Sequence, residues 1–371
     1  MLEGDPDIPL RQRAEAVTGR RGSFLTQDVQ SLEDRLRGKL EDSHVCITGG
    51  GGFIARQLLF RLFDYRPARV MLLDVSENSL ASTMRDVEAH SGGSTLVHVE
   101  PLLVDLASPG GTRALTRLEN VDTVFHLAAV KHVRSEMDEL SLSRMFEVNV
   151  GTALTVGTYA ASTSATVVAV STDKAAQPQT LMGASKAMME SVLLAGSNTT
   201  AARFPNVAFS TGSLLDSWRR RIELGEAIPV PRDTRRFLIN PSEAADMCVA
   251  ALAAHQGSIV IPRTGVLPNL ELESVARSFL DHVELPEHPV GLTGRIVASE
   301  KADECFVSVT EVEQPWLNQL SVIRNSHDSD AIMGFWEWWL DRSDGEVVLC
   351  PELISRVAAA IPEYRAPVLV R

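Results

Sequence analysis

The sequence predicts an α/β fold in which helices cover both faces of a doubly wound, parallel β-sheet. Two observations predict it. Short apolar segments alternate with segments of helical periodicity between residues 44 and 202, as in a parallel sheet with crossover helices. The first apolar segment runs directly into four glycines, Gly49–Gly52, and the second ends in Asp74. That order is typical of a Rossmann dinucleotide-binding unit.

The expected strands of the sheet are short apolar runs. They comprise residues 45–48, 69–74, 95–104, 122–127 and 165–170. The expected helices have apolar residues at helical spacing. They comprise residues 26–40, 53–64, 79–90, 241–254 and 270–280. After residue 202 the alternation is less regular, which indicates a smaller α/β domain whose elements return in part to the first sheet.

Four segments follow from this pattern. They are an N-terminal arm and helix (1–42), a Rossmann domain (43–204), a substrate-binding domain (205–312) and a C-terminal extension (313–371). Residues 1–24 are polar and rich in arginine, so we expect a loosely ordered segment or an arm that docks on a partner. The C-terminal extension holds four of the five tryptophans. We expect these rings to pack the extension onto the body, with a lid or an oligomer contact as the alternative.

Composition excludes several classes of protein. The formal net charge of the 371 residues is −13, which argues against a nucleic-acid binder with a basic stripe. The four cysteines form no Cys-x-x-Cys pair, so we expect no metal site and no disulfide framework. The sequence shows no signal peptide, and no apolar run approaches the ~20 residues of a membrane span. We therefore expect a soluble, cytoplasmic protein.

The glycine turn predicts a site for a dinucleotide. Gly49, Gly52 and Ala55 follow the spacing G-x-x-G-x-x-A between a strand and a helix, where backbone N–H groups face a pyrophosphate. Asp74 ends the second strand, where a carboxylate accepts hydrogen bonds from the adenosine ribose and repels a 2′-phosphate. NAD is therefore expected rather than NADP. Asp105 and the residue after it close the third strand, where the adenine edge lies.

A hydroxyl, an acid and an amine follow the fifth strand as Thr172, Asp173 and Lys174. Ligands of such sheets bind beyond the carboxyl ends of the strands, so these side chains reach the mouth of the cofactor cleft. The segment Met182–Lys186 opens the next helix. His126 lies inside a strand and is expected to be a buried histidine of the core.

Taken together, these segments resemble the extended short-chain dehydrogenases/reductases, and within them the UDP-N-acetylglucosamine 4,6-dehydratases of the polysaccharide-biosynthesis type. The resemblance covers residues 44–312. It rests on the pieces TGGGGFIA (48–55), VFHLAAVKHV (124–133), NVGT (149–152), STDKAAQP (171–178), MGASK (182–186), ARFPNV (202–207), TRRFLI (234–239) and SEKADE (299–304).

Three departures from the family pattern stand out. Met182 replaces the tyrosine of the Tyr-x-x-x-Lys motif, a feature similar to the membrane-anchored, configuration-retaining dehydratases. Val297–Ser299 replaces an arginine-proline-glycine piece, and Pro205 replaces a glycine. The last two changes leave the nucleotide and the sugar open.

The resemblance implies an NAD-dependent nucleotide-sugar dehydratase, with UDP-N-acetylglucosamine as the expected substrate. Carbon 4 is oxidised, water leaves across carbons 5 and 6, and hydride returns to carbon 6. Asp173 would be the acid, Lys174 the base, and Thr172 would hydrogen-bond the carbon 4 oxygen. Lys186 would hold the nicotinamide ribose, and Met182 occupies the position of the missing carbon 4 base.

The resemblance also implies which residues bind ligands. The cofactor residues would be Thr48, Gly49, Gly52, Phe53, Ile54, Asp74, Ser76, Asp105, Leu106, Ala128, Ala129, Lys131, Asn149 and Lys186. The substrate residues would be Lys131, His132, Asn206, Arg235 and Glu300; Arg235 is expected to clamp the pyrophosphate, because guanidinium matches phosphate bidentately. In this family the helices after Asn149 and Met182 pair across a two-fold axis, which implies a homodimer or a higher homo-oligomer.

Three alternatives remain open. A dehydratase could stop at the 5,6-alkene without returning hydride. A 4-epimerase would need the tyrosine base and no acid–amine pair. A protein of the same fold could bind NAD without catalysis. The loss of the tyrosine favours this alternative, and the retained Thr172–Lys174 segment argues against it. Loss of one water from a nucleotide sugar distinguishes an enzyme from such a binding protein.

Overall fold

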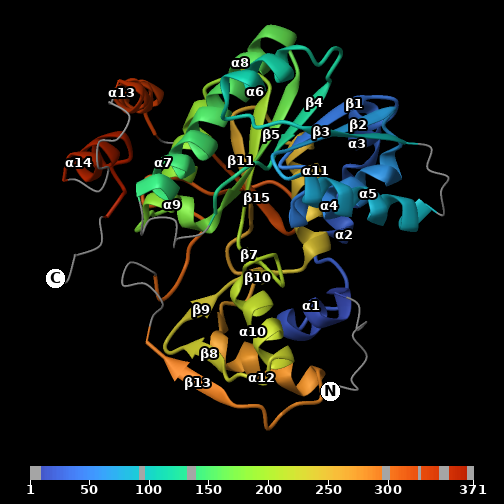
Figure 1. Ribbon diagram of the computed structural model, residues 1–371, viewed down its shortest axis with the longest axis vertical. Coiled ribbons are helices and arrows are strands. Elements are labelled where there is room, and N and C mark those ends of the chain that lie inside the picture. The colour runs from blue at the N-terminus through green and yellow to red at the C-terminus, as the bar shows by residue number, and fades with distance from the viewer. Residues whose placement is uncertain are drawn as a thin grey trace.

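The computed structural model describes residues 10–91, 97–131, 139–294, 301–324, 327–341 and 351–365 (Figure 1). Its centre is a nine-stranded sheet with the order β14-β15-β11-β6-β5-β4-β1-β2-β3. The strands that pair in parallel are β1 (His44–Thr48), β2 (Arg69–Asp74), β3 (His98–Leu103), β4 (Thr123–His126), β5 (Thr166–Thr172), β6 (Thr199–Phe204) and β11 (Ser258–Pro262). This confirms the predicted doubly wound α/β class.

The strand order reverses at β1, which has β2 on one side and β4 on the other. The two crossover connections leave in opposite directions at this point, so a crevice opens beyond the carboxyl ends of β1 and β4. Two strands complete the sheet in the antiparallel sense: β15 (Leu320–Arg324) pairs with β11, and β14 (Gln314–Pro315) pairs with β15.

Helices cover both faces of the sheet. On one face, α4 (Phe53–Leu62) packs against α11 (Pro241–Ala253), which also contacts α2 (Thr26–Ser31) and α3 (Glu33–Leu40). On the other face, α8 (Thr152–Thr163) lies between α6 (Pro109–Thr116) and α9 (Leu181–Leu194), with α7 (Glu139–Phe146) against α9. Helix α5 (Glu77–Ser91) packs beside β2 and β3. The predicted helices at 26–40, 53–64 and 79–90 match these elements within a few residues.

A smaller apolar cluster lies beyond the sheet, at the bottom of Figure 1. Its elements are α1 (Leu10–Thr18), α10 (Leu214–Glu223), β8 (Ile228–Pro231), α12 (Leu272–His282) and β13 (Val290–Thr293). Helix α1 packs on α12 and buries Ala14 and Val17, so the part of the arginine-rich arm from residue 10 to 18 is an ordered helix rather than a loose segment. The domain boundaries at residues 42, 204 and 312 stay a prediction.

Two short strand pairs connect this cluster to the sheet. They are β7 (Asn206–Val207) with β10 (Leu238–Ile239), and β9 (Arg235–Arg236) with β12 (Leu270–Glu271). Because β7 follows β6 after a single residue, its side chains lie just beyond the carboxyl edge of the sheet.

The C-terminal helices α13 (Ser329–Leu340) and α14 (Pro351–Ala360) pack on α9, at the left of Figure 1. Phe335 and Trp339 of α13 are buried against Phe146 of α7. Trp336 touches Gly151 at the end of a π-helical turn, Glu147–Gly151. The prediction that these rings pack the extension onto the body is thus confirmed. In the described segments, no helix has the length and apolar character needed to cross a membrane.

Candidate functional site

The turn between β1 and α4 has the backbone that a dinucleotide requires. Gly49 has a φ of +68°, and a Cβ there would lie 2.9 Å from the backbone N of Ala128, in the loop that follows β4. Gly52 is the N-cap of α4 in an extended conformation, and the space at its Cβ position is limited only by Gly49 O at 3.0 Å. The free N–H groups of α4 are therefore accessible to an anionic ligand.

The two middle glycines are required for packing. A Cβ on Gly50 would lie 2.7 Å from that of Leu72, and a Cβ on Gly51 would lie 2.6 Å from that of Ser79. Side chains at these positions would push β2 and α5 away from the turn. The sequence spacing assigned no role to Gly50 or Gly51, because their constraint comes from neighbours far along the chain.

Asp74 ties the end of β2 to the glycine turn. Its Oδ2 accepts a hydrogen bond from Gly51 N at 3.0 Å, and its Oδ1 accepts one from Ser76 N at 2.9 Å. A carboxylate has about four acceptor sites, so each oxygen keeps a lone pair for a further donor. The geometry fits the predicted contact with a ribose.

A cavity of about 310 Å³ extends from the glycine turn along the carboxyl ends of β1, β2, β3 and β4. Ten of the residues predicted to bind cofactor line it, namely Gly49, Gly52, Phe53, Ile54, Asp74, Asp105, Leu106, Ala128, Ala129 and Lys131. Arg144 of α7, which the sequence did not single out, also lines it and forms a 2.6 Å ion pair with Asp105. The cavity has the place and the lining expected of the crevice at the strand reversal.

Thr48 and Ser76 were also predicted to bind the cofactor, but they lie behind the residues that line this cavity. Thr48 Oγ1 lies 2.8 Å from His126 Nδ1 and accepts hydrogen bonds from the backbone N of Leu127 and Ala128 at 3.2 Å. Burial lowers the pKa of His126 to about 3, so the ring is neutral, as expected of a core histidine. Ser76 Oγ contacts Ser79 Oγ at the start of α5. These groups shape the cavity from outside it.

Asn149 is also buried, and its hydrogen bonds join two segments of the protein. Its side chain exchanges hydrogen bonds with the backbone of Val130 and donates to Ser185 Oγ at 2.8 Å. It thus fixes the loop after β4 to the start of α9. Asn149 would therefore affect a ligand at the loop indirectly, by holding the loop in place.

The predicted acid and amine meet at the end of β5. Lys174 Nζ lies 3.1 Å from Asp173 Oδ1, and Thr172 Oγ1 donates to the same carboxylate oxygen at 2.9 Å. Lys174 Nζ also donates to Asn206 Oδ1 at 3.3 Å and lies 3.7 Å from Glu304 Oε1. Asp173 is fully buried, and the Lys174 side chain is 19% exposed.

Lys174 is held as an ammonium ion in this arrangement. Burial lowers the pKa of Lys174, but the negative charges of Asp173 and Glu304 more than offset it, so the pKa is raised above its usual value. A cationic lysine cannot accept a proton. A base role for Lys174 therefore requires that its proton first move to a neighbour.

Lys186 and Met182 lie on α9, next to this segment. Lys186 Nζ donates to Val170 O at 2.7 Å and lies 2.8 Å from Met189 Sδ. Burial lowers the pKa of Lys186 to about 8. Met182 is buried in the apolar cluster that α9 shares with the C-terminal helices.

Two arginines that are adjacent in the sequence, Arg235 and Arg236, have different environments in the structure. Arg235 is exposed and pairs with Glu271 at 2.7 Å, whereas Arg236 is buried and donates to Lys301 O and Ala302 O. Arg236 also acts electrostatically on Lys174, so it is the arginine of the predicted TRRFLI piece that lies near the acid–amine pair. His132 and Glu300 lie outside the described residues.

A buried ion cluster positions the segment 301–311 beside Lys174. Arg203, at the end of β6, makes bidentate contacts with Glu190 of α9 at 2.6–2.9 Å and with Glu311 at 2.8–2.9 Å. Its guanidinium also donates to Phe306 O at 2.8 Å. The cluster joins the sheet, α9 and the segment that carries Glu304. Arg203 and Glu304 were not predicted as site residues, because the contacts that bring them to the site join segments far apart in the chain.

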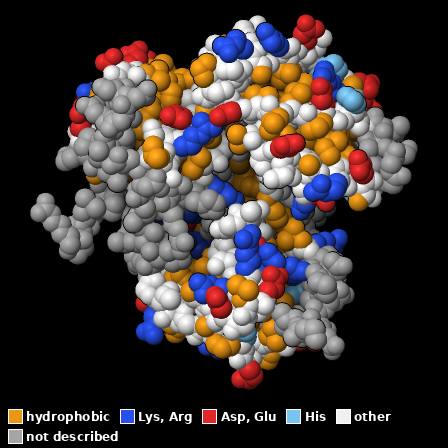
Figure 2. All heavy atoms as spheres, in the orientation of Figure 1, with side chains coloured by type: hydrophobic (Ala, Val, Ile, Leu, Met, Phe, Trp, Pro, Cys, Tyr) orange, Lys and Arg blue, Asp and Glu red, His pale blue; other side chains and the backbone are white. Residues whose placement is uncertain are grey.

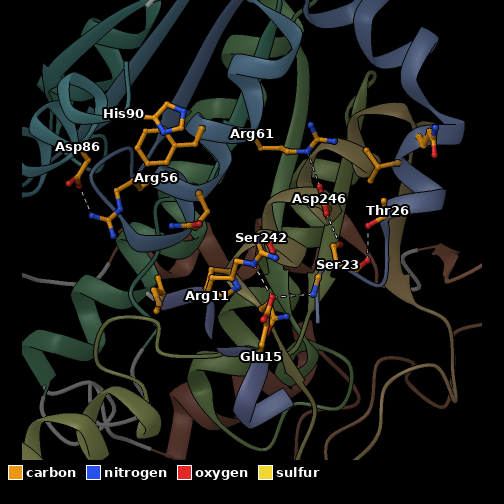
Figure 3. A pocket seen from close by; sticks show the side chains of 18 of the residues that line it. Arg11, Glu15, Ser23, Thr26, Arg56, Arg61, Asp86, His90, Ser242 and Asp246 are labelled. Atoms are coloured by element: carbon orange, nitrogen blue, oxygen red, sulfur yellow. Dashed lines mark hydrogen bonds and ion pairs between the residues drawn. The ribbon is translucent and has the colours of Figure 1, made fainter. Parts of the chain in front are cut away.

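A second, wider cavity of about 1310 Å³ lies between α1, α4, α5 and the start of α11 (Figure 3). None of the predicted site residues that the structure describes lines it. Its arginines point at carboxylates: Arg56 contacts Asp86, and Arg61 contacts Asp246. In the space-filling view, Lys and Arg side chains gather instead where the smaller cluster meets the sheet (Figure 2).

The sequence matches a family model described as polysaccharide biosynthesis protein over residues 45–320. This chain belongs to that family. It is 29% identical over 334 residues to the probable polysaccharide biosynthesis protein EpsC of Bacillus subtilis, covering 87% of this chain and 53% of EpsC. It is 30% identical over 272 residues to the capsular polysaccharide biosynthesis protein CapD of Staphylococcus aureus, covering 70% of this chain and 43% of CapD. The chain thus spans about half the length of these relatives.

Solved structures of other proteins share this fold. Pen from Bacillus thuringiensis superposes with a TM-score of 0.67 at 23% identity, covering 77% of this chain and 89% of Pen. WbmF from Bordetella bronchiseptica, crystallised with NADH, gives a TM-score of 0.54 at 17% identity, covering 70% of this chain and 82% of WbmF. At these identities the likeness establishes the Rossmann-type fold alone.

Proposed function

We propose that this protein is an NAD-dependent nucleotide-sugar dehydratase, with UDP-N-acetylglucosamine as substrate and 4,6-dehydration as reaction. The observation that carries the proposal is the contact between Asp173 and Lys174 at the end of β5. Val170 of the same strand lines the cavity that the glycine turn forms. An acid–amine pair beside a dinucleotide cleft is what a coupled oxidation and elimination requires.

NAD is the proposed cofactor because the residues present fit it. Asp74 retains acceptor capacity at the ribose position, and the N-cap residue Gly52 of α4 makes no side-chain capping hydrogen bond. WbmF, of the same fold, was crystallised with NAD+ and with UDP. When bound, NAD supplies the oxidation at carbon 4 and the matching reduction at carbon 6.

The ion pair differs by one proton from the acid–amine pair that elimination needs. A proton that moves from Lys174 Nζ to Asp173 Oδ1, across 3.1 Å, leaves a neutral amine and a carboxylic acid. The amine then takes the carbon 5 proton while the acid protonates the departing 6-hydroxyl. The carbon 6–oxygen bond breaks as the carbon 5–carbon 6 double bond forms, water leaves, and the ion pair is restored.

Other residues would bind and orient the sugar. Thr172 Oγ1, which donates to Asp173 Oδ1 in this structure, is proposed to turn its proton to the carbon 4 oxygen when the sugar binds. Asn206 offers an amide beside Lys174. Lys131 lines the cavity and is proposed to bind both cofactor and substrate. The predicted contacts of His132, Arg235 and Glu300 stay predictions.

A homodimer through α8 and α9 is also proposed, following the predicted pairing of these helices. The C-terminal helices already cover part of α9. A partner would therefore contact α8 and the outer surface of α13. Sedimentation that shows monomer alone at micromolar concentration would contradict a dimer.

Mass spectrometry of a nucleotide-sugar panel tests the function. We expect UDP-N-acetylglucosamine to lose the mass of one water. Asp173→Asn and Lys174→Ala should keep NAD binding and lose dehydration by about 10²-fold or more, with deuterium exchange at carbon 5 abolished in Lys174→Ala. Glu273→Gln, which removes an exposed ion pair on α12, is the matched control. A Lys174→Ala variant that dehydrates at the parent rate would refute the assignment.

A 4-epimerase is the second candidate. The chain is 30% identical over 252 residues to the UDP-glucose 4-epimerase of Rickettsia conorii, of which it covers 71%. Epimerisation leaves the mass unchanged and alters chromatographic retention, so the same panel separates the two reactions. Bound NAD without turnover of any sugar would favour a non-catalytic protein, and a stable 5,6-alkene would favour a dehydratase that returns no hydride.

A further inference from the structure

The segment 301–311 brings a second pair of opposite charges against Lys174. Glu304 Oε1 lies 3.7 Å from Lys174 Nζ, and Glu304 Oε2 lies 3.6 Å from Lys301 Nζ. The side chains of Glu304 and Lys301 are 2% and 9% exposed. Lys174 therefore lies between two carboxylates, and Glu304 lies between two ammonium groups.

Several atoms of this group have unused hydrogen-bonding capacity. Within the described part of the chain, Asp173 Oδ2, Asn206 Nδ2, Lys301 Nζ and Glu304 Oε2 are buried and make no hydrogen bond. Such atoms cost free energy unless a ligand satisfies them. Two acceptors and two donors thus remain without a hydrogen bond around the Lys174 ammonium, and Glu304 and Lys301 contribute one of each.

The charges that act on Lys174 come from three elements. Asp173 lies on the turn after β5, Glu304 on the segment 301–311, and Arg236 on β9. Burial lowers the pKa of Lys174, the two carboxylates raise it, and Arg236 lowers it. Lys301 carries a positive charge, as Arg236 does. It lies beside Oε2 of Glu304, whereas Lys174 lies beside Oε1, so it partly neutralises the charge that Glu304 presents to Lys174.

We propose that Glu304 and Lys301 are positioning residues that set when Lys174 releases its proton. The negative charge of Glu304 favours the ammonium form of Lys174, and the positive charge of Lys301 weakens this effect. The balance between them determines the cost of the proton shift from Lys174 Nζ to Asp173 Oδ1. This inference rests on the proposed function, in which Lys174 is the carbon 5 base.

Competitive labelling with acetic anhydride measures the protonation of Lys174 directly. Only the neutral amine reacts, so the yield of acetylated Lys174 peptide against pH gives a midpoint. In Glu304→Gln we expect the midpoint to fall by about 1 unit or more, because an opposite charge at this distance is removed. In Lys301→Met we expect it to rise, because Glu304 then acts without its counter-charge.

Opposite shifts distinguish this role from a structural one, because loosened packing would move both midpoints in the same direction. The pH dependence of dehydration should shift in the same sense as each midpoint. Glu273→Gln serves as the control and should leave the midpoint unchanged. If Glu304→Gln does not fold, the rise in Lys301→Met decides alone.

Unchanged midpoints, or shifts of the same sign, would overturn the proposal. The labelling needs no nucleotide sugar, so its outcome is independent of turnover. Opposite shifts in a protein that alters no sugar would refute the proposed function and leave the electrostatic role of Glu304 and Lys301 intact.

Discussion

Arg203→Met tests whether the buried ion cluster holds the site together. Arg203 is fully buried and makes five hydrogen bonds, four of them to the carboxylates of Glu190 and Glu311. Its removal leaves two buried carboxylates without a counter-charge. Breaking one buried pair costs about 3–5 kcal/mol, so we expect at least the upper part of that range, a large share of a typical stability of about 5–15 kcal/mol.

Urea unfolding followed by tryptophan fluorescence measures this loss, since Trp218 is fully buried. The control is Arg277→Met, whose ion pair with Glu273 lies at the surface and contributes about 0–1 kcal/mol. Combining Arg203→Met with Glu190→Gln and Glu311→Gln should recover much of the loss, because neutral amides cost less to bury than unpaired charges.

The reasoning fails if Arg203→Met unfolds at the same urea concentration as the control. It also fails if the triple variant is no more stable than Arg203→Met, because the loss would then come from packing alone and not from the two carboxylates.

Four further predictions concern single side chains. Asp74→Ala should weaken NAD binding by about 1–2 kcal/mol in calorimetry, and a parent that binds NADP equally well would contradict the role of Asp74. Burial raises the pKa of Cys46 to about 12, so a thiol reagent at pH 8 should label Cys46 only after unfolding; rapid labelling of the folded chain would be the contrary result. Trp339→Ala should lower the unfolding free energy by about 3–5 kcal/mol, measured in urea, since its ring lies 4.8 Å from that of Phe146. Burial lowers the pKa of Lys186 from 10.5 to about 8, so between these pH values the unfolded chain binds a proton that the folded chain does not. The stability of the parent relative to Lys186→Met should therefore rise from pH 8 towards pH 10.5; a flat difference would contradict the lowered pKa of Lys186.

The parts of the fold that depend on local pattern could be predicted from the sequence. The strand that ends at Asp74 and the turn at Gly49–Gly52 are adjacent to the apolar runs that define them, and Asp173 and Lys174 are neighbours at a strand end. In each case a periodicity or a spacing of a few residues carries the information.

The remaining features depend on contacts between distant segments. Arg235 and Arg236 differ in sequence by one position, and only the pairing of β9 with β12 determines which side chain points outward. Glu304 reaches Lys174 because Arg203 anchors its segment, a contact between residues about a hundred positions apart. Asp173 raises the pKa of Lys174 most and Glu304 adds to this effect, so the adjacent acid accounts for only part of the charge around the amine.

The antiparallel strand β15 has a consequence for biosynthesis. Strand β11 pairs with β6 on one side and with β15 on the other, and β15 leaves the ribosome last of the three. Until then the apolar β11, which is buried along its whole length, presents an open edge to other chains. Unpaired edges of this kind favour aggregation, so nascent chains that stall before residue 320 should depend on chaperones more than completed ones.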